Sequence, residues 1–147
     1  MSAVKALVAE WDTEAKQTRK LLERIPEDKL NWRPHPKSMS LGHLAYHLGS
    51  GTKIFAKGIL SQDVLTWTGG KQAEPSTVQD ILDAFDAGDG EMRAGLAALE
   101  EEALGATWIF GTVEKPMMTV PRAAAIRGFL FSHLIHHRGQ LSVYLRL

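Results

Sequence analysis

The residues best suited to chemistry in this chain are its histidines. The 147-residue sequence has six histidines and no cysteine. His133 and His137 are four residues apart, and His47 lies in a separate segment with His43 close by. Side chains four residues apart on a helix leave the same face, with their Cα atoms about 6 Å apart along the axis. Two imidazoles placed in this way can bind one metal ion at about 2.0–2.1 Å from each nitrogen.

Both groups of histidines lie in segments whose apolar spacing predicts a helix. The last helix is predicted to begin at Pro121 and to run nearly to the end of the chain. Its inward residues are Ile126, Leu130, His133, His137, Leu141 and Tyr144. An earlier helix is predicted from Leu41 to about Leu60, with Ser38 or Ser40 as its N-cap. Its inner face holds Leu44, His47, Leu48, Gly51 and Phe55.

Three inward histidines on two helices predict a shared metal site at His47, His133 and His137. A buried imidazole nitrogen without a partner costs about 1–3 kcal/mol, and one ion would satisfy all three rings. Three protein ligands leave a coordination position open, as in catalytic sites. We expect zinc or nickel, with iron and copper as alternatives. Two other interpretations compete with the metal site. The histidines could be separate core residues that hydrogen-bond to their neighbours, or they could form a triad without a metal that is held by hydrogen bonds and water.

Four neighbouring residues are candidates for supporting roles. His43 could flank the site or cap the helix start, and His136 could hydrogen-bond to a ligand or be solvated. Arg138 could form a salt bridge with a neighbouring helix, which we favour, or recognise an anionic substrate. Gln140 could orient a ligand histidine, because such rings need a hydrogen-bond partner, or be a surface amide.

Two further helices complete the predicted fold. The first has inward residues from Val4 to Ile25 and ends at Pro26, and the third follows a capping box at 76–79. Residues 108–110 with Val113 could form a short extended piece. Four helices of about 20 residues predict an all-α four-helix bundle, in one domain spanning residues 1–147. Its long connections permit crossovers, so a simple up-down-up-down order is not required.

Composition excludes several classes of protein. Lys plus Arg and Asp plus Glu are both 17, so the chain lacks the basic excess of a nucleic-acid-binding protein. The absence of cysteine excludes disulfides and a thiol nucleophile from this chain, and fits a cytoplasmic location. No signal peptide is recognised, and no run approaches the roughly 20 apolar residues of a membrane span.

Two segments resemble the DinB-like (DinB/YfiT) family. Residues 32–42, Trp-Arg-Pro-His-Pro-Lys-Ser-Met-Ser-Leu-Gly, followed by His47, resemble its opening signature. Residues 133–141, His-Leu-Ile-His-His-Arg-Gly-Gln-Leu, resemble its closing signature. The resemblance implies a four-helix bundle with up-down-down-up order and a metal triad at His47, His133 and His137. Similar proteins are often dimers, so a homodimer is expected. In similar proteins a short tail with a Tyr-Gly-Pro stretch often follows the last helix. The sequence stops at Leu147 without such a stretch, which puts any substrate contacts of the tail in question.

Members of this family include thiol-dependent S-transferases and a mycothiol-dependent maleylpyruvate isomerase. The resemblance therefore implies a divalent-metal-dependent enzyme that activates water or a small thiol for hydrolysis or S-transfer to an electrophilic small molecule. Because the chain has no cysteine, that thiol would be an external, low-molecular-weight one. The alternative is a non-enzymatic metal- or ligand-binding bundle of a stress response, with a structural metal. No nucleic-acid or membrane partner is expected.

Overall fold

Long helices form most of the computed structural model, which describes residues 2–67, 69 and 73–147. The three long α-helices before the last helical stretch are α1 (Ala3–Leu22), α2 (Leu41–Leu60) and α3 (Val78–Ala97). The last helical stretch consists of α4 (Arg122–Ala125), a π-helix (Ile126–Ser132) and α5 (His133–Tyr144). Short 3-10 helices cover Glu27–Lys29 and Glu101–Gly105. The structure thus confirms a predominantly helical fold with four principal helical stretches.

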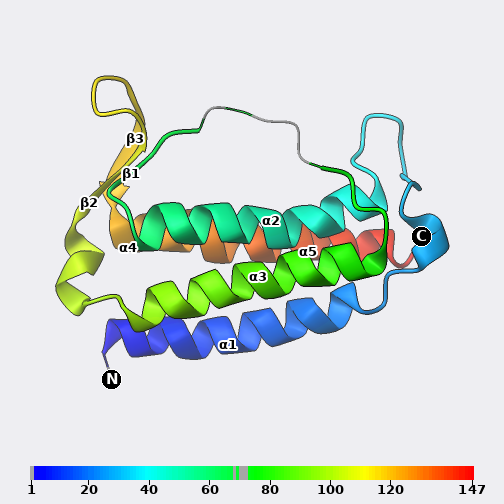
Figure 1. Cartoon of the computed structure of the whole chain (residues 1–147), viewed down its shortest axis with the longest axis horizontal. Coiled ribbons are helices and arrows are strands. Elements are labelled where there is room, and N and C mark those ends of the chain that lie inside the picture. Colours follow the sequence, from blue (N-terminus) through cyan, green and yellow to red (C-terminus); the bar gives the residue numbers. More distant parts are fainter. Residues whose placement is uncertain (1, 68, 70–72) are drawn as a thin grey trace.

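The four stretches lie side by side along a common axis (Figure 1). In this view α1 and the α4–α5 stretch run from left to right, whereas α2 and α3 run from right to left. Because α2 and α3 run the same way, the end of α2 and the start of α3 lie at opposite ends of the bundle. The expectation of long connections was therefore correct. In the resulting arrangement, α2 packs against α5.

The start of α2 is set by Ser40, one of the two predicted caps. Its Oγ accepts a hydrogen bond from the backbone N–H of His43 at 3.0 Å, which satisfies one of the unpaired N–H groups of the first turn. The helix then runs from Leu41 to Leu60 as predicted.

The predicted capping box before α3 is displaced by one residue. Thr77, and not Ser76, is the N-cap, and Asp80 replaces Gln79 as its partner. The Asp80 carboxylate accepts from the backbone N–H groups of Ser76 and Thr77 at 2.9 and 2.8 Å. These hydrogen bonds lower the pKa of Asp80, since they favour the charged carboxylate. Gln79 instead donates to Asp83 along the helix surface.

A small sheet corrects the all-α prediction. Its strands are β1 (Val64–Leu65), β2 (Thr107–Gly111) and β3 (Pro116–Pro121), in the order β1-β2-β3. β1 is parallel to β2, and β2 is antiparallel to β3. Trp108 is fully buried, and its indole N–H donates to the carbonyl of Gly58 at 2.9 Å. Residues 108–110 of the predicted extended piece thus lie in the central strand, which is fixed to the end of α2, whereas Val113 lies in the turn between β2 and β3.

Glycines allow α2 and α3 to pack closely. A Cβ on Gly49 would lie 2.4 Å from the backbone nitrogen of Phe85, and one on Gly88 would lie 2.6 Å from the Gly49 carbonyl oxygen. Real Cβ atoms essentially never come this near, so both positions exclude larger residues. Within the described residues, no helix is long and apolar enough to cross a bilayer.

Candidate metal centre

Three imidazole rings meet between α2 and α5. His47 lies in the second turn of α2 between the buried Leu44 and Leu48, while His133 and His137 occupy the first two turns of α5. The Nε2 of His133 is 3.2 Å from the Nε2 of His47 and 3.0 Å from the Nε2 of His137. One ring nitrogen from each histidine lies within 4.8 Å of the other two. The structure therefore brings together the three histidines that the sequence singled out.

The spacing of these nitrogens fits a single divalent ion. Two nitrogens that each lie at about 2.0–2.1 Å from one ion are about 2.9 Å apart at a right angle and about 3.4 Å apart at the tetrahedral angle. The observed 3.0 and 3.2 Å fall between these values. In the described part of the chain, no fourth His, Asp or Glu joins the group. The donor set therefore fits a three-imidazole site that leaves other coordination positions free.

The environment of the cluster favours neutral rings. Burial, followed by the neighbouring His137, His47 and His136, lowers the pKa of His133 to about 4. Burial also lowers the pKa of His137, against the opposing effect of its hydrogen bond with Gln140. A neutral imidazole is the form that binds a metal, so these rings are available as ligands at neutral pH.

Gln140 is placed to orient His137. Its Oε1 lies 2.7 Å from Nδ1 of His137 and accepts the proton carried there. With Nδ1 protonated, Nε2 of the neutral ring presents its lone pair to the cluster. Gln140 therefore occupies the position of a partner that fixes ring orientation and tautomer.

The other two histidine candidates lie outside the cluster. Nδ1 of His43 is 2.8 Å from a carboxylate oxygen of Glu74, in the connection before α3. His136 is exposed on α5, with its ring centroid 4.9 Å from that of His137. Neither contributes a nitrogen to the group of three.

Arg138 forms a bridge between helices. Its guanidinium pairs with Glu14 of α1 at 2.5 Å and donates to the Glu14 carbonyl and the Thr18 hydroxyl. These contacts correspond to the structural salt bridge favoured from the sequence, and they hold α5 against α1.

Two residues adjoining the cluster were not proposed as site residues from the sequence. A Cβ on Gly51 would be 3.5 Å from Cε1 of His47 and 3.6 Å from Cε1 of His133. This glycine therefore lies directly next to both rings. Phe55 meets His133 edge to face, with centroids 5.8 Å apart. Their positions four and eight residues after His47 place them on the same helix face, which was the available signal.

Comparison with known proteins decides the family. A family model described as the DinB superfamily matches residues 10–141. The chain belongs to the DinB superfamily. The uncharacterized protein YrdA of Bacillus subtilis (strain 168) is 27% identical over 143 residues, which are 92% of this chain and 77% of YrdA. The family predicted from the two signature segments is therefore confirmed.

Solved structures of DinB-like proteins share the fold. One from Bacillus cereus ATCC 10987 aligns with a TM-score of 0.77 at 20% identity, over 97% of this chain and 90% of that protein. The DinB-like protein YjoA of Bacillus subtilis aligns with a TM-score of 0.76 at 26% identity, over 96% and 90% of the two chains. These alignments confirm a DinB-like helical fold over nearly the whole chain.

Proposed function

We propose that this DinB-superfamily protein is a metal-dependent enzyme whose ion is held by His47, His133 and His137. The observation that carries the proposal is the convergence of three imidazoles, in which the Nε2 of His133 lies 3.2 Å from that of His47 and 3.0 Å from that of His137, distances that fit one ion. Zinc and nickel are the metals expected for such a site. The directions of the helices in Figure 1 fit the up-down-down-up order implied by the family resemblance.

When bound, the ion would supply a Lewis acid that makes a water or thiol a better nucleophile at neutral pH. The chain's own residues have simpler tasks. His47 would bind the ion from α2 and His133 would bind it from α5. Gln140 would keep the lone pair of His137 directed at the ion. Because the chain has no cysteine, S-transfer to an electrophilic small molecule would use an external thiol, and water would serve for hydrolysis.

The first experiment is metal analysis of untagged protein purified without a nickel column. We expect about one equivalent of a divalent metal in the wild type and almost none in His137→Ala. His35→Ala is the matched control, because His35 is exposed, lies outside the group of three and has an Nδ1 that accepts from the backbone N–H of Lys37 at 3.1 Å. Equal metal content in the wild type and His137→Ala would refute the site.

A structural metal is the second candidate, since ligands from both α2 and α5 would let an ion brace the two helices. A panel of low-molecular-weight thiols against electrophiles, with and without metal, separates the two functions. Turnover that requires the metal supports the enzyme. Loss of thermal stability on metal removal, with no turnover, supports the brace.

A further inference from the structure

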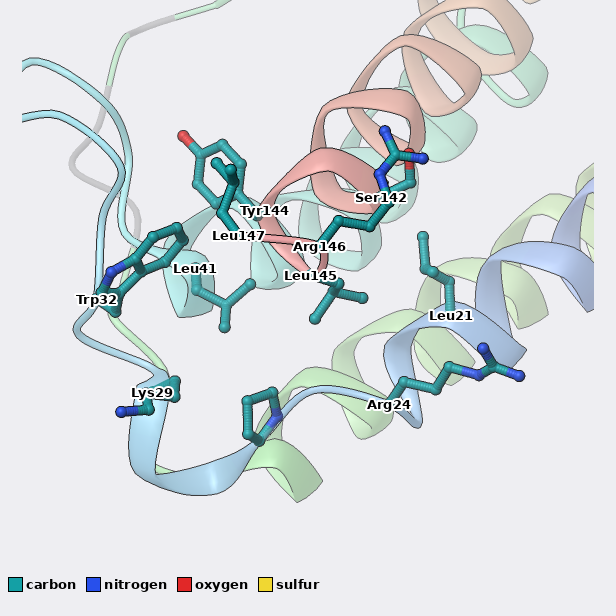
Figure 2. A pocket seen from close by; sticks show the side chains of 11 residues that line it. Leu21, Arg24, Lys29, Trp32, Leu41, Ser142, Tyr144, Leu145, Arg146 and Leu147 are labelled. Atoms are coloured by element: carbon teal, nitrogen blue, oxygen red, sulfur yellow. The ribbon is translucent and has the colours of Figure 1, made fainter.

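A second feature of the fold lies about two helical turns beyond the histidines. A cavity of about 620 Å³, open to solvent on one side, is bounded by the end of α1, the segment after it, the start of α2 and the end of α5 (Figure 2). Small-molecule sites commonly measure about 300–1,000 Å³, so this volume suits a small ligand. The residues that line it are Leu21, Arg24, Pro26, Lys29, Trp32, Leu41, Ser142, Tyr144, Leu145, Arg146 and Leu147.

The cavity is separate from the candidate metal centre. Tyr144 follows His137 by seven residues, which is about 10 Å along a helix. The fully buried Leu141 lies between them on the same face, and Leu44 occupies the corresponding position between Leu41 and His47 on α2. A ligand in the cavity would therefore not reach the imidazole nitrogens without displacing core leucines.

Backbone contacts hold the wall of the cavity in place. The N–H of Leu41 donates to the carbonyl of Trp32 at 2.8 Å, and the Tyr144 hydroxyl donates to the carbonyl of Met39 at 3.2 Å. The rings of Trp32 and Tyr144 meet edge to face at 5.8 Å. The apolar wall is thus formed before any ligand binds, which lowers the entropic cost of binding.

The charged side chains that line the cavity are all cationic. Its lining side chains include three cations, Arg24, Lys29 and Arg146, and no Asp or Glu (Figure 2). In the described part of the chain, Arg24 and Arg146 form no ion pair, and Lys29 has only a 3.8 Å contact with the exposed Asp28. An apolar interior with a cationic rim complements a ligand that has an apolar body and an anionic head group.

We propose that this cavity binds a small amphipathic anion, such as a medium-chain carboxylate or an aromatic sulfonate or carboxylate. The apolar body would lie against Leu41, Leu145 and Trp32, while the head group would lie at the rim, where the Arg24 and Arg146 guanidinium groups point to different sides of the opening (Figure 2). This site is independent of the metal centre and would remain if the metal proposal failed.

The test uses the intact, untagged protein and the fluorescent anion 8-anilinonaphthalene-1-sulfonate. We expect saturable binding of about one molecule per chain, with the cooperative thermal transition of the native protein retained. Leu145→Trp, which fills the cavity, should weaken binding at least tenfold. Arg24→Glu with Arg146→Glu should weaken it about three- to tenfold, as expected when the exposed positive charge of the rim is reversed.

Lys16→Glu is the matched control, because Lys16 is an exposed cation of α1 outside the cavity, and it should leave binding unchanged. Decanoate should displace the probe more effectively than decanol or decyltrimethylammonium. No saturable binding, equal binding by Leu145→Trp, or equal displacement by decanol would overturn the proposal. Self-association that buries this face without probe binding would also overturn it and assign the face to a second copy.

Discussion

Substitution of Gly49 by alanine tests the close packing of α2 on α3. The new Cβ would lie 2.4 Å from the backbone nitrogen of Phe85 and 2.5 Å from the carbonyl carbon of Ala84, whereas ordinary contact begins at 3.4 Å. The helices would have to separate by about 1 Å because these atoms are backbone and cannot rotate away. Overpacking of this kind costs about 3 kcal/mol at the upper end of its usual range. The better helix propensity of alanine returns about 1 kcal/mol, which leaves a net loss of about 2 kcal/mol.

Gly90→Ala provides the control for this substitution. Gly90 is exposed on α3, and a Cβ there would have no atom within 4 Å, so only the propensity gain of about 0.5–1 kcal/mol remains. Urea unfolding followed by circular dichroism should move the midpoint down for Gly49→Ala and up for Gly90→Ala, with equal slopes. Midpoints that shift in the same direction would refute the packing argument.

Three further results are expected. The unfolding free energy of the metal-free protein should fall by about 1–2 kcal/mol as pH drops from about 6.5 to about 4. Over this range the imidazole of His133 takes up a proton in the unfolded chain but stays neutral in the folded protein, so protonation favours unfolding; the loss is moderated because the ring is partly exposed. An unfolding free energy that does not change with pH would contradict the lowered pKa of His133. Gln140→Leu should weaken metal binding about tenfold in a chelator competition, since it removes the acceptor for His137, and unchanged affinity would exclude that role. Arg122→Met should cost about 2–3 kcal/mol in urea unfolding because it leaves the Ile59 carbonyl unpaired, and a loss below 0.5 kcal/mol would contradict this.

Local signals explain what the sequence predicted well. Ser40 precedes a continuous three-and-four apolar pattern, and the helix that follows has the predicted bounds Leu41–Leu60. The same periodicity placed His47, His133 and His137 at inward positions, and the structure brings their rings together. Capping and periodicity both depend on residues within a few positions of each other, so they can be read from one sequence.

The sheet depended on contacts that no local pattern shows. β1 has only two residues, and its Val64 pairs with Ile109 far along the chain. The displaced cap at Thr77 had a different cause, because two overlapping pairs matched the capping pattern and the charged Asp80 formed more hydrogen bonds. The sequence also predicted one regular helix after Pro121, whereas Ile126–Ser132 form a π-helix, which the three-and-four apolar spacing does not reveal.

That π-helical segment sets the rotational phase of the residues that follow it. Seven residues wound more widely than an α-helix accumulate roughly one residue of offset, which is about 100° of rotation. Upstream, the buried Arg122 ties the chain to the end of α2, and downstream begin the turns that carry His133 and His137. Deleting a single residue within the segment would therefore let it return to a regular α-helix with both imidazoles still facing α2, whereas a deletion in the first turn of α5 before His137 would rotate that ring by about 100°. In descent, one codon could thus be gained or lost inside this segment while the triad is kept.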